Sequence, residues 1–115
     1  MDLAAQHCRN LGPETPPLEG PALAELLARI DPAWRVESGP LLVRRFTSKD
    51  YPRLAALATR IALLAQAEDH HPDLALGYGT LEVALTTHSV GGLSQNDFVL
   101  AARIDFLARE SDFTS

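Results

Sequence analysis

The 115-residue sequence predicts an α+β domain in which helices cover one face of a four-stranded antiparallel sheet. Three segments repeat apolar residues at intervals of three and four, which is typical of amphipathic helices. Short segments rich in apolar residues lie between them, in pairs that are separated by glycine or proline. Such pairs favour antiparallel hairpins over parallel crossovers. The expected order of elements is therefore α-β-β-α-β-β-α.

The first half of the domain is predicted as one helix and one hairpin. The helix begins near Pro21, because a proline costs nothing in the first helical turn. It is expected to end at Asp31-Pro32, since the residue before a proline avoids the helical region. Strands at 34–37 and 41–46 follow, and Ser38-Gly39-Pro40 between them has the chemistry of a turn.

The second half is predicted as a long helix, two strands and a last helix. The long helix covers about 50–69 and carries a wide, alanine-rich apolar stripe. A short strand is expected at 74–76. A second strand begins at Leu81, where apolar and polar residues alternate. The last helix is expected to begin at Ser94, after a glycine pair breaks the chain.

Composition bounds the domain and its partners. We expect an irregular segment over 1–20, one domain over 21–110 and a loose tail over 111–115. The net charge of −5 and the pI near 5.2 argue against binding to nucleic-acid phosphates. Cys8 is the single cysteine, so no disulfide can form within the chain. The sequence shows neither a signal peptide nor an apolar stretch long enough for a membrane span, so we expect a cytoplasmic protein.

The stretch EDHHPD holds two of the four histidines. Adjacent side chains on a helix point about 100° apart, so His70 and His71 cannot share a ligand within a regular helix. At a helix end before Pro72, however, the two rings could converge. The alternative interpretation is that one ring stabilises the helix C-terminus while the other is solvated.

His88 and Asp97 extend this candidate site. His88 follows the second predicted strand and precedes a glycine break, which is a common place for functional side chains. Histidine is the side chain best suited to proton transfer near neutral pH. In the alternative interpretation His88 is an exposed loop residue and Asp97 completes a capping box with Ser94. Zinc is disfavoured, because the adjacent histidines lack the i, i+4 spacing that presents two imidazoles to one metal.

The segment from His70 to Asp105 resembles the pterin-4a-carbinolamine dehydratase family. The resemblance depends on a series of motifs, whose members are His70-His71-Pro72, Tyr78, Thr87-His88, Gly92-Leu93-Ser94, Asp97 and Ala101-Ala102-Arg103-Ile104-Asp105. Upstream, similar residues stand at Trp34, Leu42, Arg44, Phe46 and Tyr51, so the resemblance covers about 21–108. The sequence departs from the usual family pattern at Gln66, Leu74 and Thr80.

The resemblance implies the α+β fold described above and dehydration of 4a-hydroxytetrahydropterin to quinonoid dihydropterin, with no metal or organic cofactor. It implies that His70, His71 and His88 share the acid and base roles at the pterin. It further implies that Asp73, Thr87 and Asp97 help to bind the substrate.

Two further implications concern partners. Members of the family assemble as dimers or tetramers, so we expect a homodimer or a homotetramer. A dehydratase-like branch acts in RuBisCO assembly beside carboxysome genes, so an assembly factor that binds the RuBisCO large subunit is the alternative function.

Overall fold

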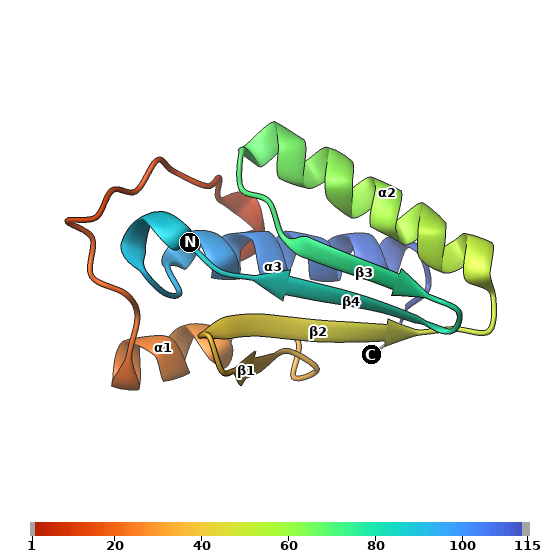
Figure 1. Ribbon diagram of the computed structural model, residues 1–115, viewed down its shortest axis with the longest axis horizontal. Coiled ribbons are helices and arrows are strands. Elements are labelled where there is room, and N and C mark those ends of the chain that lie inside the picture. The colour runs from red at the N-terminus through yellow and green to blue at the C-terminus, as the bar shows by residue number, and fades with distance from the viewer. Residues whose placement is uncertain (1, 114–115) are drawn as a thin grey trace.

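The chain forms a four-stranded antiparallel sheet with helices packed on one face (Figure 1). The structure is a computed structural model, and it describes residues 2–113. The predicted fold class and the order of helices and strands are confirmed. Two short 3-10 helices add to the prediction. The elements in chain order are η1 (Leu3–Ala5), α1 (Gly20–Leu27), β1 (Arg35–Glu37), β2 (Leu41–Thr47), α2 (Tyr51–Glu68), β3 (Asp73–Gly77), β4 (Thr80–Leu85), η2 (His88–Val90) and α3 (Gln95–Glu110).

The sheet has the strand order β1-β2-β4-β3, so the two hairpins meet through β2 and β4. In this central pair Leu42 lies opposite Leu85 and Phe46 lies opposite Leu81. These side chains point towards the helices and are buried, as the alternation in the sequence predicts. The strands β1 and β3 form the two open edges of the sheet.

The long helix α2 begins and ends at residues that the sequence marks. The Asp50 carboxylate accepts a hydrogen bond from the Arg53 N–H at 3.2 Å and so caps the helix. At the other end Asp69 adopts a left-handed conformation with φ 51°, which stops the helix. The His70 N–H still donates to the Ala65 carbonyl at 3.2 Å, which closes the last turn. The chain therefore turns away from the helix axis immediately before the histidine pair.

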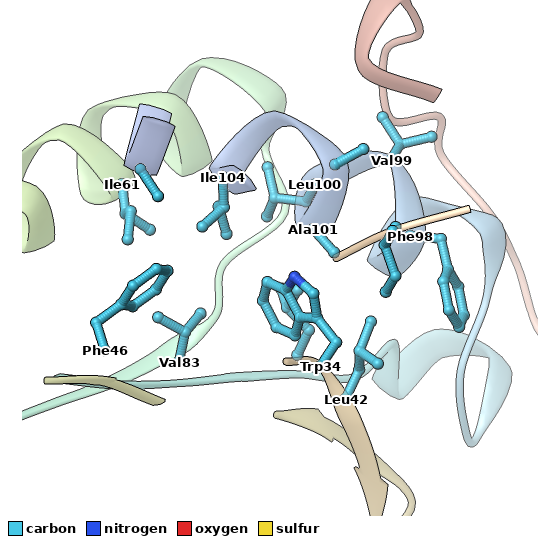
Figure 2. Close-up of a cluster of buried hydrophobic side chains, with 14 of the residues drawn as sticks. Trp34, Leu42, Phe46, Ile61, Val83, Phe98, Val99, Leu100, Ala101 and Ile104 are labelled. Atoms are coloured by element: carbon cyan, nitrogen blue, oxygen red, sulfur yellow. The ribbon is translucent and has the colours of Figure 1, made fainter. Parts of the chain in front are cut away.

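The core lies between the sheet and α3, which is the central helix. Every residue of α3 from Asn96 to Ala102 is buried, because the helix is covered by the sheet, by α2 and by η1. Figure 2 shows Trp34 and Leu42 on one side of this core, facing Leu100 and Phe98 of α3. The helix α2 contributes Leu54, Leu57, Ile61 and Ala65, a narrower stripe than the sequence predicts.

The first helix is shorter than expected and ends at Leu27 instead of extending to Asp31. The reason is a tertiary contact, because the Asp31 N–H donates to the Asp105 carboxylate at 2.9 Å and is thereby drawn out of the helical path.

The two terminal segments are packed more closely than the sequence suggests. Residues 2–19 hold one short helix, η1, which contacts α3, and Leu3 is only 2 % exposed. We expected a loose tail over 111–115, yet Phe113 is buried and its ring lies edge-on to Phe46 with centroids 5.7 Å apart. Residues 114 and 115 lie outside the described part of the chain. The domain boundary itself stays a prediction.

A buried ion pair joins the sheet to α3. Arg44 of β2 is 2 % exposed and donates to the carboxylate of Asp105. The Trp34 indole N–H donates to the same carboxylate at 2.7 Å. Burial raises the pKa of Asp105, and the hydrogen bonds from the Asp31 N–H, Trp34 and Arg44 oppose that rise. One carboxylate thus connects β2, α3 and the segment before β1.

Removal of this carboxylate is expected to be costly. In the variant Asp105→Ala the guanidinium of Arg44 stays buried without its partner, which should lower the free energy of unfolding by about 3–5 kcal/mol. Urea denaturation followed by circular dichroism measures the change.

The matched control is Glu82→Ala, which removes an exposed partner of Arg45 and should cost less than about 1 kcal/mol. Equal losses in the two variants would contradict a special role for the buried pair.

Candidate functional site

The antiparallel β3–β4 pair brings the histidine-containing segments to one end of the sheet. Asp73, the first residue of β3, lies opposite Ala84, near the end of β4. The residues before β3 and those after β4 therefore leave the sheet at the same end. His70 and His71 lie in the first of these segments, and His88 begins η2 in the second. The sequence could place each histidine on its element, but the strand register decides that they lie at a common end.

His70 belongs to a hydrogen-bonded cluster centred on Asp97. The His70 Nε2 lies 2.7 Å from Asp97 Oδ1, and the Thr87 hydroxyl donates to Asp97 Oδ2 at 2.8 Å. Asp97 is fully buried, whereas the side chain of His70 is 12 % exposed. The imidazole is thus fixed on its inner side by a carboxylate and keeps limited access to solvent. A carboxylate in this position fixes the orientation of an imidazole.

Asp97 also stabilises the start of α3. Its Oδ2 accepts the Ser94 N–H at 2.9 Å, while the Ser94 hydroxyl accepts the Asn96 N–H, so the predicted capping box is present. The Thr87 and Ser94 hydroxyls lie 2.8 Å apart and complete the cluster. The two interpretations of Asp97 are therefore compatible, because one oxygen caps the helix and the other holds His70.

His71 has a different partner and more exposure. Its Nε2 lies 2.9 Å from the Gln66 amide oxygen, one turn back on α2. With that oxygen as the acceptor, Nε2 is the donor of this hydrogen bond. Gln66 is one of the positions at which the sequence departs from the family pattern, where a glutamate is usual. An amide orients the ring but gives an imidazolium less support than a carboxylate would.

A polar cavity of about 200 Å³ lies beside this cluster. His70 and Thr87 line it, together with Asp69, Ser89 and Asn96. The other predicted site residues, His71, His88 and Asp73, are exposed at the same end of the sheet but do not line this cavity. The structure therefore brings His70, Thr87 and Asp97 into direct contact, and the grouping of all three histidines around one ligand stays a prediction.

The sequence analysis missed one side of the cavity. Residues 8–11 of the N-terminal segment and Glu68 of α2 also line it. Glu68 lies within EDHHPD and could have been singled out as a carboxylate near the histidines. The segment 8–11 carries no periodic pattern or motif, so its position is a purely tertiary feature.

Within residues 2–113 no group of three or more His, Cys, Asp or Glu side chains is placed to hold a metal ion. No helix in that range is both long and apolar enough to span a bilayer.

Comparison with known proteins decides the family. The family model described as "Pterin 4 alpha carbinolamine dehydratase" matches residues 16–107. The chain belongs to the pterin-4a-carbinolamine dehydratase family. A relative from Nitrosospira multiformis, named "Putative pterin-4-alpha-carbinolamine dehydratase", is 38% identical over 106 residues that make up 92% of each chain. A Gloeobacter violaceus relative with a similar name is also 38% identical and spans 96% of this chain and 97% of its own.

Two solved structures are similar to this one. A protein from Brucella melitensis, described as a transcriptional coactivator/pterin dehydratase, superposes with a TM-score of 0.74 and 29% identity over 80% of this chain and 98% of its own. A pterin dehydratase-like protein, described as a RuBisCO assembly factor in the α-carboxysome, superposes with a TM-score of 0.57 and 26% identity over 66% of this chain and 89% of its own. Dehydratase-like folds of this family therefore include proteins described as having roles other than catalysis.

The cluster around Asp97 should support stability as well as the site. Asp97→Ala removes the acceptor of three buried or half-buried donors, which should lower the free energy of unfolding by about 2–4 kcal/mol. Asp50→Ala is the control, because it removes an exposed carboxylate that caps α2 through one hydrogen bond and should cost about 1 kcal/mol. Denaturant unfolding of both variants makes the comparison. If Asp97→Ala lowers the free energy of unfolding no more than Asp50→Ala does, Asp97 is not the shared acceptor that stabilises this cluster.

Proposed function

We propose that the protein dehydrates 4a-hydroxytetrahydropterin to quinonoid dihydropterin through histidine acid/base catalysis. The observation that carries the proposal is the His70–Asp97 pair at 2.7 Å on the wall of a polar cavity, in a chain that belongs to the dehydratase family. A pterin is a flat heterocycle with several donors and acceptors, which suits a cavity lined by hydroxyl, amide and carboxylate groups.

The reaction needs one proton donor and one proton acceptor. The C4a–O bond breaks, and the departing hydroxyl takes a proton from a general acid to leave as water. A general base removes the proton from N5, and the electron pair of that N–H bond forms the C4a=N5 double bond. After the step the acid has lost one proton and the base has gained one, so no proton is gained or lost overall. Positioned histidines fit both roles, because imidazole exchanges protons near neutral pH.

The three histidines divide into one fixed ring and two exposed rings. His70 is held by Asp97, which orients the ring. His71, oriented by Gln66, and His88 in η2 are placed at the same end of the sheet. We assign the acid and base roles to this trio without dividing them further, and we assign Asp73, Thr87 and Asp97 to substrate binding and support. Neither a metal nor an organic cofactor enters the proposed reaction.

Substitution of the histidines tests the proposal. His70→Ala, His71→Ala and His88→Ala should each slow dehydration while the protein stays folded, because a positioned acid or base contributes about 10²–10⁴-fold to such a step. The 4a-hydroxytetrahydropterin is generated in a stopped-flow cell, and its absorbance decay is followed with and without protein.

Glu110→Gln is the control, since Glu110 lies in an exposed ion pair with Arg60 at the far end of α3 and outside the proposed trio. Unchanged rates in all three trio variants would refute the assignment, and a folded wild type without any acceleration would refute the dehydratase function.

RuBisCO assembly is the second candidate function. The similar solved structure described as a RuBisCO assembly factor favours it, as does the amide of Gln66 in place of a carboxylate beside His71. In that case the folded wild type would leave the dehydration rate unchanged and would retain the RuBisCO large subunit in a pull-down.

We also propose that the protein is a cytoplasmic homodimer or homotetramer. The strands β1 and β3 leave two open sheet edges, and open edges are usually covered by a partner. Large apolar side chains are exposed on both long helices, with Leu63 at 68 % and Phe106 at 51 %. Light scattering at micromolar concentration should therefore give two or four times the chain mass of 12.5 kDa. A single 12.5 kDa species would contradict the proposal.

A further inference from the structure

One side of the cavity beside His70 is formed by a segment that precedes the domain. Residues 8–11, which we call the strap, supply Cys8, Arg9, Asn10 and Leu11 to the lining. The rest of the lining comes from residues 68–70 at the end of α2, from Thr87 and Ser89 after β4, and from Asn96 of α3. The family model begins at residue 16, so the strap lies before the part of the chain that the model matches. Figure 1 shows this N-terminal segment arching around the end of the molecule at which α3 begins, before it reaches α1.

Glu68 holds the first part of the strap. Its Oε1 accepts the Cys8 N–H at 2.7 Å, and its Oε2 lies 2.8 Å from His7 Nδ1 and 2.9 Å from the Arg103 guanidinium. Burial by itself raises the pKa of Glu68, but the hydrogen bonds from His7 and the Cys8 N–H, together with the charge of Arg103, lower it below its ordinary value. The Glu68 carboxylate is therefore ionised at neutral pH. It binds the strap from a position two residues before His70 in the sequence.

Asn96 holds the next residue of the strap through both atoms of its amide. The Arg9 N–H donates to Asn96 Oδ1 at 2.9 Å, and Asn96 Nδ2 donates to the Arg9 carbonyl at 2.7 Å. This pairing copies the two-way bonding between adjacent strands. Asn96 directly precedes Asp97, so the strap is attached to the same helix start that orients His70.

The strap is also fixed beyond both of its ends. On one side Leu3 is buried against α3, and on the other the Leu18 N–H donates to the Leu93 carbonyl at 2.8 Å. The side chains of Arg9 and Asn10 remain exposed, and Arg9 is the one Lys or Arg among the residues that line the cavity. The backbone of the strap is thus held while its polar side chains stay free to meet a ligand.

We propose that the strap is a substrate-retaining wall of the His70 site, with Glu68 and Asn96 as the positioning residues that keep it closed over a bound pterin. The inference rests on the proposed function, because it assigns the pterin to this cavity. Strap contacts of this kind bind substrate and transition state alike, so weakening them raises KM and leaves kcat nearly unchanged.

Two variants are designed to loosen the strap without changing His70, His71 or His88. Glu68→Gln keeps the shape of the side chain and removes its charge, and Asn96→Leu keeps its approximate volume and removes both hydrogen bonds to Arg9. The control is Glu110→Gln, which removes the same kind of charge from an exposed ion pair with Arg60 on the far end of α3.

Hydrogen exchange reports the state of the strap independently of activity. In both strap variants the Cys8 and Arg9 amides should exchange about fivefold faster than in the wild type, the factor expected for a hydrogen bond worth about 1 kcal/mol. The amide of Val83, in the centre of the sheet, should be unaffected in all variants. KM for the 4a-hydroxytetrahydropterin should rise about fivefold in the strap variants, with kcat changed less than about twofold. Glu110→Gln should match the wild type in both measurements.

The outcomes separate the two proposals. Faster exchange of the strap amides with an unchanged KM would overturn the retaining role, as would unchanged exchange in both strap variants. A wild type without turnover would overturn the proposed reaction. In that case calorimetric titration with 7,8-dihydrobiopterin tests the retaining role of the strap. Weaker binding in both variants than in the wild type would support that role, and equal or absent binding would overturn it.

Discussion

The buried carboxylate of Asp97 is the contact on which the functional end of the molecule depends. One of its oxygens accepts from Thr87, just past β4, and from the backbone at the start of α3, and the other holds His70 just past α2. Three elements that are distant in the sequence therefore converge on a single charge. A buried carboxylate is stable only when donors surround it. The stability of the helix start and the orientation of the candidate acid/base residue consequently have the same physical cause.

The same helix carries a second buried carboxylate, Asp105, and the two carboxylates attach opposite ends of α3 to the rest of the fold. Asp105 pairs with Arg44 in the centre of the sheet and fixes how α3 lies on β2. Asp97 acts at the other end of the helix, where the chain leaves β4. Because both carboxylates are satisfied by partners from other elements, α3 can be buried almost completely although its sequence is not uniformly apolar. The helix is thus held at two points, and the site lies at one of them.

The fold and the side chains around His70 bear differently on the function. The fold also belongs to a protein described as a RuBisCO assembly factor, so the fold by itself does not fix the function. The chemistry lies in the side chains at the end of the sheet, where a carboxylate supports His70 and an amide supports His71. The N-terminal segment, bound by Glu68 and Asn96, closes one side of the cavity and lies before the segment that the family model matches. Differences between members of the family are expected to concentrate in these contacts.

The sequence alone determined the fold class and most of the elements, because local rules act at the positions concerned. Alternation marked β4, the capping box of Ser94 and Asp97 marked the start of α3, and Ser38-Gly39-Pro40 marked the first turn. It also singled out His70, His71, His88 and Asp97 as candidates, since two adjacent histidines precede a proline, a third histidine follows a strand and Asp97 lies at a helix start. It could not place Arg44 against Asp105, the early end of α1, the packing of Phe113 or the strap over the cavity. Each of these depends on contacts between residues far apart in the chain, and only the register of β3 on β4 and the burial of α3 bring those residues together.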